Sequence, residues 1–224
     1  MNKYLFGLLL IILGCNSGEI EQEIVIIKTP IKYPDGTSET FSSQINISYY
    51  KGKILYDFPK YISESMDGIP VLDSIGHDYV LIKPGDSTAY FFTSLHQKEL
   101  KLRHVGSFLK DRIIEIIHAD SIFKYINKSD VINHTHDENE YRYKYNVTGI
   151  DSIYIFTAKN KEKFNYSFSR QLDSFFKNKV VKIEFLATFD SSYEKEDRRI
   201  SFSLSKGKFA DKNEILSIFQ KTKN

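Results

Sequence analysis

The chain has 224 residues, of which 41% are hydrophobic and 27% charged, a balance typical of a folded protein and not of a disordered one. Its formal net charge is only +2, and its longest basic cluster, residues 98–104, alternates with Leu100 and Leu102 like a strand face, so nucleic acid is excluded as a partner. The single cysteine excludes an internal disulfide, a zinc–thiolate site and an iron–sulfur cluster.

The first fifteen residues have the composition of an export signal. Lys3 supplies a positive charge, residues 4–13 form an unbroken apolar run, and Gly14 precedes Cys15. A transmembrane helix needs about 20 apolar residues, whereas the apolar region of a signal peptide has about 7–15. The length of the run therefore indicates export followed by removal of the segment.

The end of this segment, Ile12-Leu13-Gly14-Cys15, resembles the lipobox of bacterial lipoproteins. The resemblance implies cleavage after Gly14, which makes residues 1–14 a signal peptide, and a diacylglycerol on the sulfur of Cys15. Leu13 is bulkier than the residue usual at that position of the lipobox. An ordinary secretory signal would instead end in an Ala-x-Ala-like site, and residues 7–18 contain none. Because two or more acyl chains hold a protein firmly on a membrane, the resemblance implies a permanent anchor.

The overall composition, rich in Ile, Lys, Asn, Tyr and Phe, combines with the lipobox to resemble lipoproteins of the Bacteroidota type. That resemblance implies anchoring in the bacterial envelope, with the outer membrane favoured, on its periplasmic face or at the cell surface. Residues 15–23 are expected to be a lipidated acidic tether, and Glu19, Glu21 and Glu23 resemble an interleaved form of a surface-export signal. No Pro/Gly/Ser-rich linker divides residues 24–224, which we expect to form one strand-rich domain.

Strand patterns dominate the first half of this domain. Runs of β-branched, aromatic and alternating residues predict strands at 24–27, 41–50, 53–56, 78–83 and 88–93. Lys51-Gly52 and Pro84-Gly85-Asp86-Ser87 have the turn chemistry of hairpins. The first of these strands is expected to end at Pro30.

The second half mixes helices and strands. Residues 108–126 carry apolar residues at helical spacing and predict an amphipathic helix, with a strand as the alternative because many of them are β-branched. The polar residues 127–140 predict a loop. Further strands are predicted at 141–148, 152–156, 164–168, 181–189 and 200–204, and a short helix at 172–176. Asp211 and Glu214 form a capping box, which predicts a C-terminal helix.

These elements predict an α+β fold, with a large curved antiparallel β-sheet and two or three packing helices, including a C-terminal amphipathic helix. Antiparallel pairing is favoured because the gaps between strands have the length of hairpin loops and lack repeated helical crossovers. A curved sheet with helices is similar to the folds of lipoprotein carriers, and that resemblance implies a lipid-handling role.

The densest group of metal-ligand types is His134, His136 and Asp137. Two histidines at i and i+2 point the same way on an extended chain, and a carboxylate beside them would complete a ligand set. The alternative is a solvated loop, because the group lies in a polar segment and no second cluster closes the coordination shell. The segment His118-Ala119-Asp120-Ser121 lacks a nucleophile elbow and reads as a polar helix end. We expect neither a cofactor nor a catalytic set.

An Asp-Ser pair followed by Ile or Thr recurs four times, with the serines at Ser74, Ser87, Ser121 and Ser152. The pattern resembles the O-glycosylation sequon of exported Bacteroidota proteins and would place sugar on the serine. Ordinary turn chemistry is the alternative, since both side chains bond their own backbone before a strand begins.

The function expected from these features is that of a lipid-anchored envelope protein of binding or structural type, without catalysis. Tyr141, Tyr143 and Tyr145 form an aromatic face that packs a sheet or contacts a ligand, so the expected partners are the membrane, a protein, or a small apolar or saccharide ligand. The rival hypothesis is an anchored hydrolase that uses the His134/His136 segment or a carboxylate pair. The pattern makes no prediction of the oligomeric state.

Overall fold

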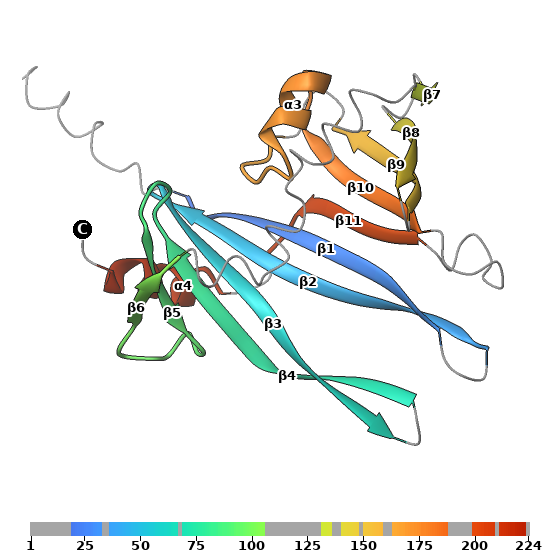
Figure 1. The fold of residues 1–224 in the computed structure, drawn as a ribbon. Coiled ribbons are helices and arrows are strands. Elements are labelled where there is room, and N and C mark those ends of the chain that lie inside the picture. The colour runs from blue at the N-terminus through green and yellow to red at the C-terminus, as the bar shows by residue number, and fades with distance from the viewer. Residues whose placement is uncertain are drawn as a thin grey trace, which may run out of the picture.

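The computed structural model describes residues 19–32, 36–66, 69–105, 131–135, 140–147, 150–158, 163–187, 199–208 and 211–222. Within these residues eleven strands form one antiparallel sheet, and two helices, α3 (Arg170–Phe176) and α4 (Lys212–Lys221), pack on it (Figure 1). The strands are β1 (Glu21–Lys32), β2 (Ser38–Tyr50), β3 (Lys53–Met66), β4 (Ile69–Ile82), β5 (Thr88–Phe92), β6 (Lys101–His104), β7 (Val131–Thr135), β8 (Glu140–Val147), β9 (Ile150–Thr157), β10 (Val180–Ala187) and β11 (Arg199–Lys206). The predicted α+β class with a large curved antiparallel sheet is confirmed.

The order of strands across the sheet is β6-β5-β4-β3-β2-β1-β11-β10-β9-β8-β7. The first strand, β1, therefore lies in the middle of the sheet. Strands β2 to β6 follow one another to one edge, and strands β7 to β11 run from the other edge back to the middle. There β11 pairs with β1 over six residue pairs, from Glu23↔Lys206 to Lys28↔Ser201. This single ladder joins the two halves of the sheet.

The hairpins follow the predicted turn chemistry. Lys51 and Gly52 both have positive φ, at 47° and 75°, which is the conformation of the two-residue turn that matches strand twist. Gly85, with φ 95°, occupies the turn between β4 and β5. Both predicted hairpins, β2–β3 and β4–β5, are confirmed.

The strand β1 is longer than its apolar run predicts at both ends. It continues past Pro30, because β11 pairs with β1 only as far as Lys28 and proline there removes no hydrogen bond to β11. It also begins at Glu21, so residues 21–23, expected in the tether, belong to the sheet. The acidic side chains of Glu21 and Glu23 hide this strand start in the sequence, although Glu23 is fully buried.

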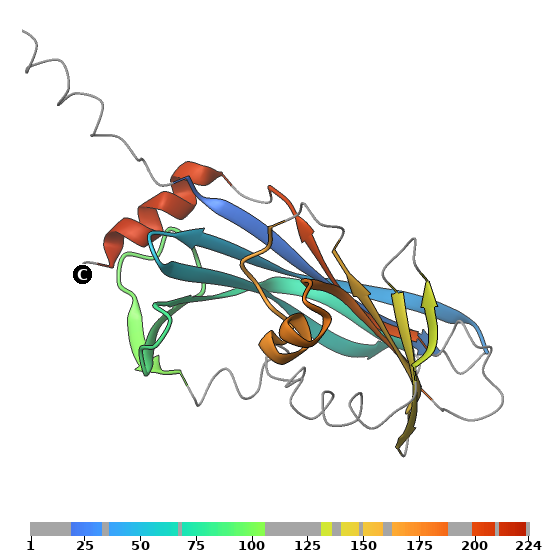
Figure 2. The ribbon, with the colours of Figure 1, turned by 90° about the horizontal axis from the view of Figure 1, so that it is seen from above.

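Both faces of the sheet are packed, because neighbouring residues of one strand, which point to opposite faces, are both buried at several places. The α3 face carries a core that runs across β1, β2, β3, β4, β5, β9, β10 and β11 and includes Leu172 of α3. The α4 face carries a smaller core at one end, in which Ile215, Ile218 and Phe219 of α4 meet β3, β4 and β5. Figure 2 shows the two helices on opposite sides of the sheet.

Both helices begin with a side-chain cap, and the cap of α4 is the predicted one. Asp211 accepts a hydrogen bond from the backbone N–H of Asn213 at 2.7 Å and caps α4, which confirms the C-terminal amphipathic helix. Ser169 accepts one from Leu172 at 3.1 Å and caps α3. Neither of these helices in the described part of the chain is long and apolar enough to cross a membrane.

Two predictions of local structure are wrong. The polar segment 127–140 contains a strand, β7, because edge pairing with β8 uses main-chain groups that polar side chains do not disturb. The alternating segment 164–168 is not a strand, because the backbone N–H groups of Asn165 and Tyr166 donate to the carboxylate of Glu23 and not to a neighbouring strand. The predicted helix at 108–126 lies outside the described residues.

Candidate functional site

The metal-ligand candidates are only partly described. His134 lies in the edge strand β7, opposite Tyr141 of β8, whereas His136 and Asp137 lie outside the described residues. Within the ranges that the structure describes, no group of three or more His, Cys, Asp or Glu side chains is placed to hold a metal ion. Cys15 and the segment 118–121 also lie outside those ranges.

The serines of the Asp-Ser pairs lie in different surroundings. Ser152 is only 1% exposed in β9, and its hydroxyl donates to the carboxylate of Asp151 at 2.8 Å. The folded sheet therefore leaves no room for a sugar on Ser152. Ser87 lies in the exposed turn between β4 and β5, and Ser74 belongs to β4; Ser121 lies outside the described residues.

Tyr141, the first residue of the predicted tyrosine face, is partly buried against the core. The ring of Tyr141 lies 4.3 Å from that of Phe176, centroid to centroid, and joins the core of the α3 face. For Tyr141 the packing interpretation is therefore the right one.

A buried carboxylate lies on the α3 face near the start of β1. Glu23 is 0% exposed, and its Oε1 accepts hydrogen bonds from the Nζ of Lys206 at 2.8 Å and the backbone N–H of Asn165 at 2.7 Å. Its Oε2 accepts from the backbone N–H of Tyr166 at 2.8 Å. Each oxygen thus has a partner, as a buried charge requires. The carboxylate fastens the segment before α3 to the sheet.

Three tyrosines surround this carboxylate. Burial, and next the negative charge of Glu23, raise the pKa of Tyr49 far above its usual range and raise the pKa of Tyr56 to about 12. Burial, and next the proximity of Tyr56, also raise the pKa of Tyr166. All three phenols therefore stay protonated at neutral pH.

A second polar cluster lies on the α4 face. The Nδ1 of His77 lies 2.6 Å from the Oδ1 of Asp57, and the side-chain amide of Asn46 donates to Oδ2 of Asp57 at 3.0 Å. The ring of Tyr79 stacks on the imidazole with centroids 5.9 Å apart. An imidazole oriented by a carboxylate is half of a hydrolytic triad. Among the described residues, no Ser, Thr or Cys side chain hydrogen-bonds to His77 as a nucleophile would.

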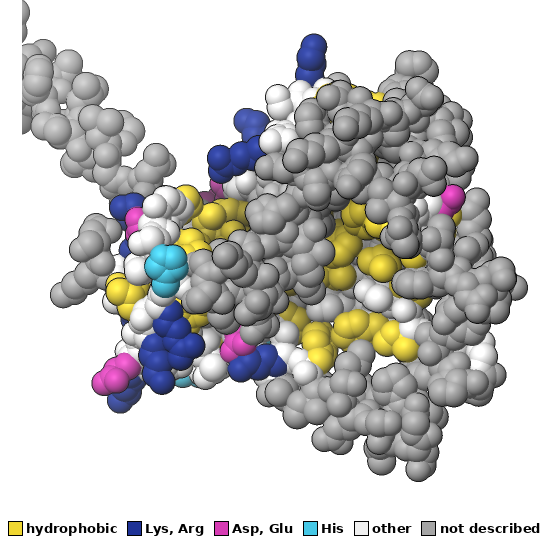
Figure 3. Space-filling view, viewed as in Figure 1, with side chains coloured by type: hydrophobic (Ala, Val, Ile, Leu, Met, Phe, Trp, Pro, Cys, Tyr) yellow, Lys and Arg dark blue, Asp and Glu magenta, His cyan; other side chains and the backbone are white. Residues whose placement is uncertain are grey.

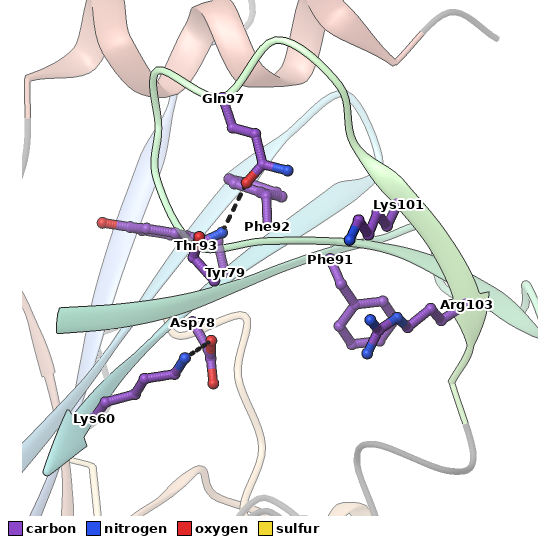
Figure 4. A pocket seen from close by; sticks show the side chains of 9 residues that line it. All are labelled: Lys60, Asp78, Tyr79, Phe91, Phe92, Thr93, Gln97, Lys101 and Arg103. Carbon is purple, nitrogen blue, oxygen red and sulfur yellow. Dashed lines mark hydrogen bonds and ion pairs between the residues drawn. The ribbon is translucent and has the colours of Figure 1, made fainter. Parts of the chain in front are cut away.

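A cavity with a volume of about 350 Å³ lies between β3, β4, β5 and β6. We call it the β3–β6 pocket. Its described lining residues are Lys60, Asp78, Tyr79, Phe91, Phe92, Thr93, Gln97, Lys101 and Arg103 (Figure 4). Aromatic rings and cations therefore meet in one cavity.

The strand register positions the cations of this pocket. Phe91 of β5 is paired with Lys101 of β6, and Ala89 with Arg103, so the two cations lie on the same face of β6 as Phe91. Figure 4 shows both side chains extending from β6 toward Phe91. On the opposite wall, the Nζ of Lys60 lies 2.7 Å from the Oδ1 of Asp78.

The loop that closes the pocket is held at both ends. The side chain of Gln97 accepts from the backbone N–H of Thr93 at 3.1 Å and donates to the carbonyl of Glu99 at 2.7 Å. From α4, the Nζ of Lys221 donates to the carbonyls of Leu95 and Gln97 at 3.2 and 3.1 Å. The cavity is thus formed by fixed elements.

The cations of this pocket come from the segment 98–104, whose alternation predicts a strand face and no anion site. Residues 101–104 do form a strand, β6. The sequence carries no signal that this face lies beside Phe91 and across from Lys60, because that depends on pairing between distant strands. In space-filling view, Lys and Arg side chains gather at the end of the molecule that carries β5 and β6, and hydrophobic side chains gather over the sheet (Figure 3).

Comparison with known proteins identifies no relative: no protein-family model matches the chain, and no curated protein matches it.

Proposed function

We propose that the protein is a lipid-anchored protein of the bacterial envelope that binds a ligand and catalyses no reaction. The observation that carries the proposal is the β3–β6 pocket, in which aromatic rings and cations line a cavity of about 350 Å³ built on paired strands. Ligand sites in proteins typically combine a largely apolar lining with a few placed polar groups.

The chemistry of the lining favours binding over acid–base catalysis. Its one carboxylate, Asp78, forms an ion pair with Lys60, and none of the nine described lining residues is His, Cys or Ser. A nucleophile and a base within hydrogen-bond reach of one another are what covalent catalysis requires. The described lining has groups that attract a charged molecule and no nucleophile–base pair of this kind.

The proposed anchor places the pocket close to the membrane. Three residues lie between Cys15 and Glu19, and the four extended steps from Cys15 to Glu19 span about 14 Å. Glu19 pairs with Lys212 at the start of α4, and Lys221 at the other end of α4 holds the pocket loop. Since ten helical residues span about 15 Å, the pocket lies roughly one helix length from the point where the tether enters the domain.

The anchor is tested by substitution of the cysteine. Cys15→Ser should leave the protein uncleaved or release it from the membrane fraction, because no sulfur is left to accept the lipid. Fractionation of cells that express the parent and the variant, with immunoblotting, measures this. A Cys15→Ser protein that is cleaved as before and stays in the membrane fraction would contradict the proposal.

The rival proposal is an anchored hydrolase. The Asp57–His77 pair is the observation that favours it, and the His134/His136 segment remains a second candidate centre. Asp57→Asn, His77→Ala and a His134→Ala/His136→Ala double variant should each match the parent in a panel of esterase, peptidase and glycosidase assays. A parent activity that any of these variants abolishes would favour the hydrolase.

A further inference from the structure

We infer that the β3–β6 pocket binds a small organic anion with an apolar body, such as an aryl or alkyl carboxylate or phosphate, whose charged group lies between Lys101 and Arg103. The inference rests on the proposed binding function and names the chemical class of the ligand.

The charge of the lining points to an anion. Lys60, Lys101 and Arg103 contribute three positive charges and Asp78 one negative charge, which leaves a formal +2. Asp78 is already paired with Lys60 at 2.7 Å, and in the described ranges neither Lys101 nor Arg103 forms an ion pair. Two cations that line one cavity and have no ion-pair partner among the described residues raise the local concentration of anions.

The spacing of these cations suits one anionic group. Residues two apart on a strand are separated by about 7 Å along it and present their side chains on the same face. The long side chains of Lys101 and Arg103 therefore reach a group held between them, and a guanidinium offers two parallel N–H donors to a carboxylate or phosphate.

The rest of the lining suits an apolar body. Phe91 lies on the face of the sheet that carries Lys101 and Arg103, so its ring is the apolar surface beside the cations. Tyr79 and Phe92 stack with centroids 5.2 Å apart on the opposite, α4 face and contribute to the lining from that side. Burial, and next the negative charges of Asp57 and Glu214, raise the pKa of Tyr79 to about 12, so its phenol carries no charge that would repel an anion. A volume of about 350 Å³ fits a small molecule and not a lipid with two acyl chains.

A second explanation of the cations is protection of an edge strand. β6 is the last strand at its edge of the sheet, and charged side chains on an edge strand prevent pairing with other chains. Under that explanation, removal of the charges would cause aggregation and leave ligand binding unchanged. The two explanations therefore predict different results for the same variant.

The test uses the full mature chain in a nonionic detergent, with 4-phenylbutyrate as the probe and ligand-observed NMR as the measurement. The neutral 4-phenylbutyramide should bind at least about tenfold more weakly, because charge-assisted hydrogen bonds are lost. The Lys101→Gln/Arg103→Gln variant should weaken 4-phenylbutyrate binding by a similar factor. The control Lys98→Gln/Arg170→Gln removes two exposed cations outside the pocket and should bind as the parent does.

Several results would overturn the inference. Equal affinity for the amide and the carboxylate would show that the charge of the ligand is not recognised. Equal affinity for inorganic phosphate and 4-phenylbutyrate would show that the apolar body is not recognised, and tighter binding of monomeric dihexanoyl phosphatidylglycerol than of 4-phenylbutyrate would point to a lipid. A double variant that aggregates on gel filtration while its monomer binds the probe unchanged would favour edge protection. If the double variant fails to fold, the salt dependence of the parent protein tests the inference. Its affinity for 4-phenylbutyrate must fall as the salt concentration rises. Failure of the Cys15 test would contradict the anchor and leave these binding results standing.

Discussion

Glu23 is a charged residue in a fully buried place, and its environment explains how the sheet tolerates it. Two backbone N–H groups and the Nζ of Lys206 donate to its carboxylate, all within 2.8 Å. The desolvation of the carboxylate is thereby offset by charge-assisted hydrogen bonds. Because Asn165 and Tyr166 supply the backbone donors, the residue also fixes the path of the chain into α3.

The substitution Glu23→Gln should destabilise the protein by about 3 kcal/mol or more. It leaves the ammonium of Lys206 with only the more distant carboxylate of Glu21 as a charge partner, and it turns an amide N–H₂ toward backbone donors. Urea denaturation followed by circular dichroism measures the free energy of unfolding. Glu21→Gln is the matched control: Glu21 is 57% exposed and 3.7 Å from the same ammonium, so its loss should cost less than about 1 kcal/mol. Equal stabilities of the two variants would contradict the role of Glu23.

The tyrosines beside Glu23 predict how stability depends on pH. Tyr56 has a pKa of about 12 in the folded protein against 10.0 in a model peptide, so above pH 10 the unfolded chain binds fewer protons than the folded one. Stability should therefore be constant up to about pH 9 and fall between about pH 10 and 12. Tyr56→Phe should make that fall shallower in urea titrations across this range, and an unchanged slope would contradict the assignment.

At the scale of elements, α4 connects the tether, the α4-face core and the pocket loop. Ile218 and Ile215 are buried against β3, β4 and β5, while Lys212 and Lys221 at its two ends contact Glu19 and the loop 93–100. The helix therefore contributes both to the stability of the sheet and to the shape of the pocket.

Ile218→Ala should lower the free energy of unfolding by about 2–5 kcal/mol, because Ile218 is 0% exposed and its removal leaves a cavity. Gln220→Ala lies two residues away on the exposed side of α4 and should change stability by less than about 0.5 kcal/mol. Thermal denaturation of both variants measures the difference. A similar loss in the two would show that α4 does not pack as described.

Elements whose signals are local could be predicted from the sequence. The β2–β3 turn at Lys51-Gly52 and the cap at Asp211 depend only on neighbouring residues, and both have the predicted structure. The segment 164–168 alternates like a strand, yet its backbone donors go to Glu23, about 140 residues away in the chain. The pocket could not be predicted from the sequence for the same reason, because Lys60 and Arg103 are brought to one cavity only by the register of β3, β4, β5 and β6.

At the scale of the whole molecule, the sheet joins the start and the end of the chain. β1 pairs with β2 on one side and with β11 on the other, so the ladder of six residue pairs between β1 and β11 connects two runs of hairpins. The first strand of the sheet, its last strand and α4 meet where the tether enters. A lipid on Cys15 would thus attach to the centre of the sheet and not to an edge.

The most direct test of the lipid-anchored account is the intact mass of the mature protein purified from its native membranes. A lipid anchor predicts a chain that begins at Cys15 and carries the added mass of the acyl groups on that residue, and any further mass would report sugars on the Asp-Ser pairs. A mature chain that begins at another residue, or one that carries no added mass at all, would contradict it.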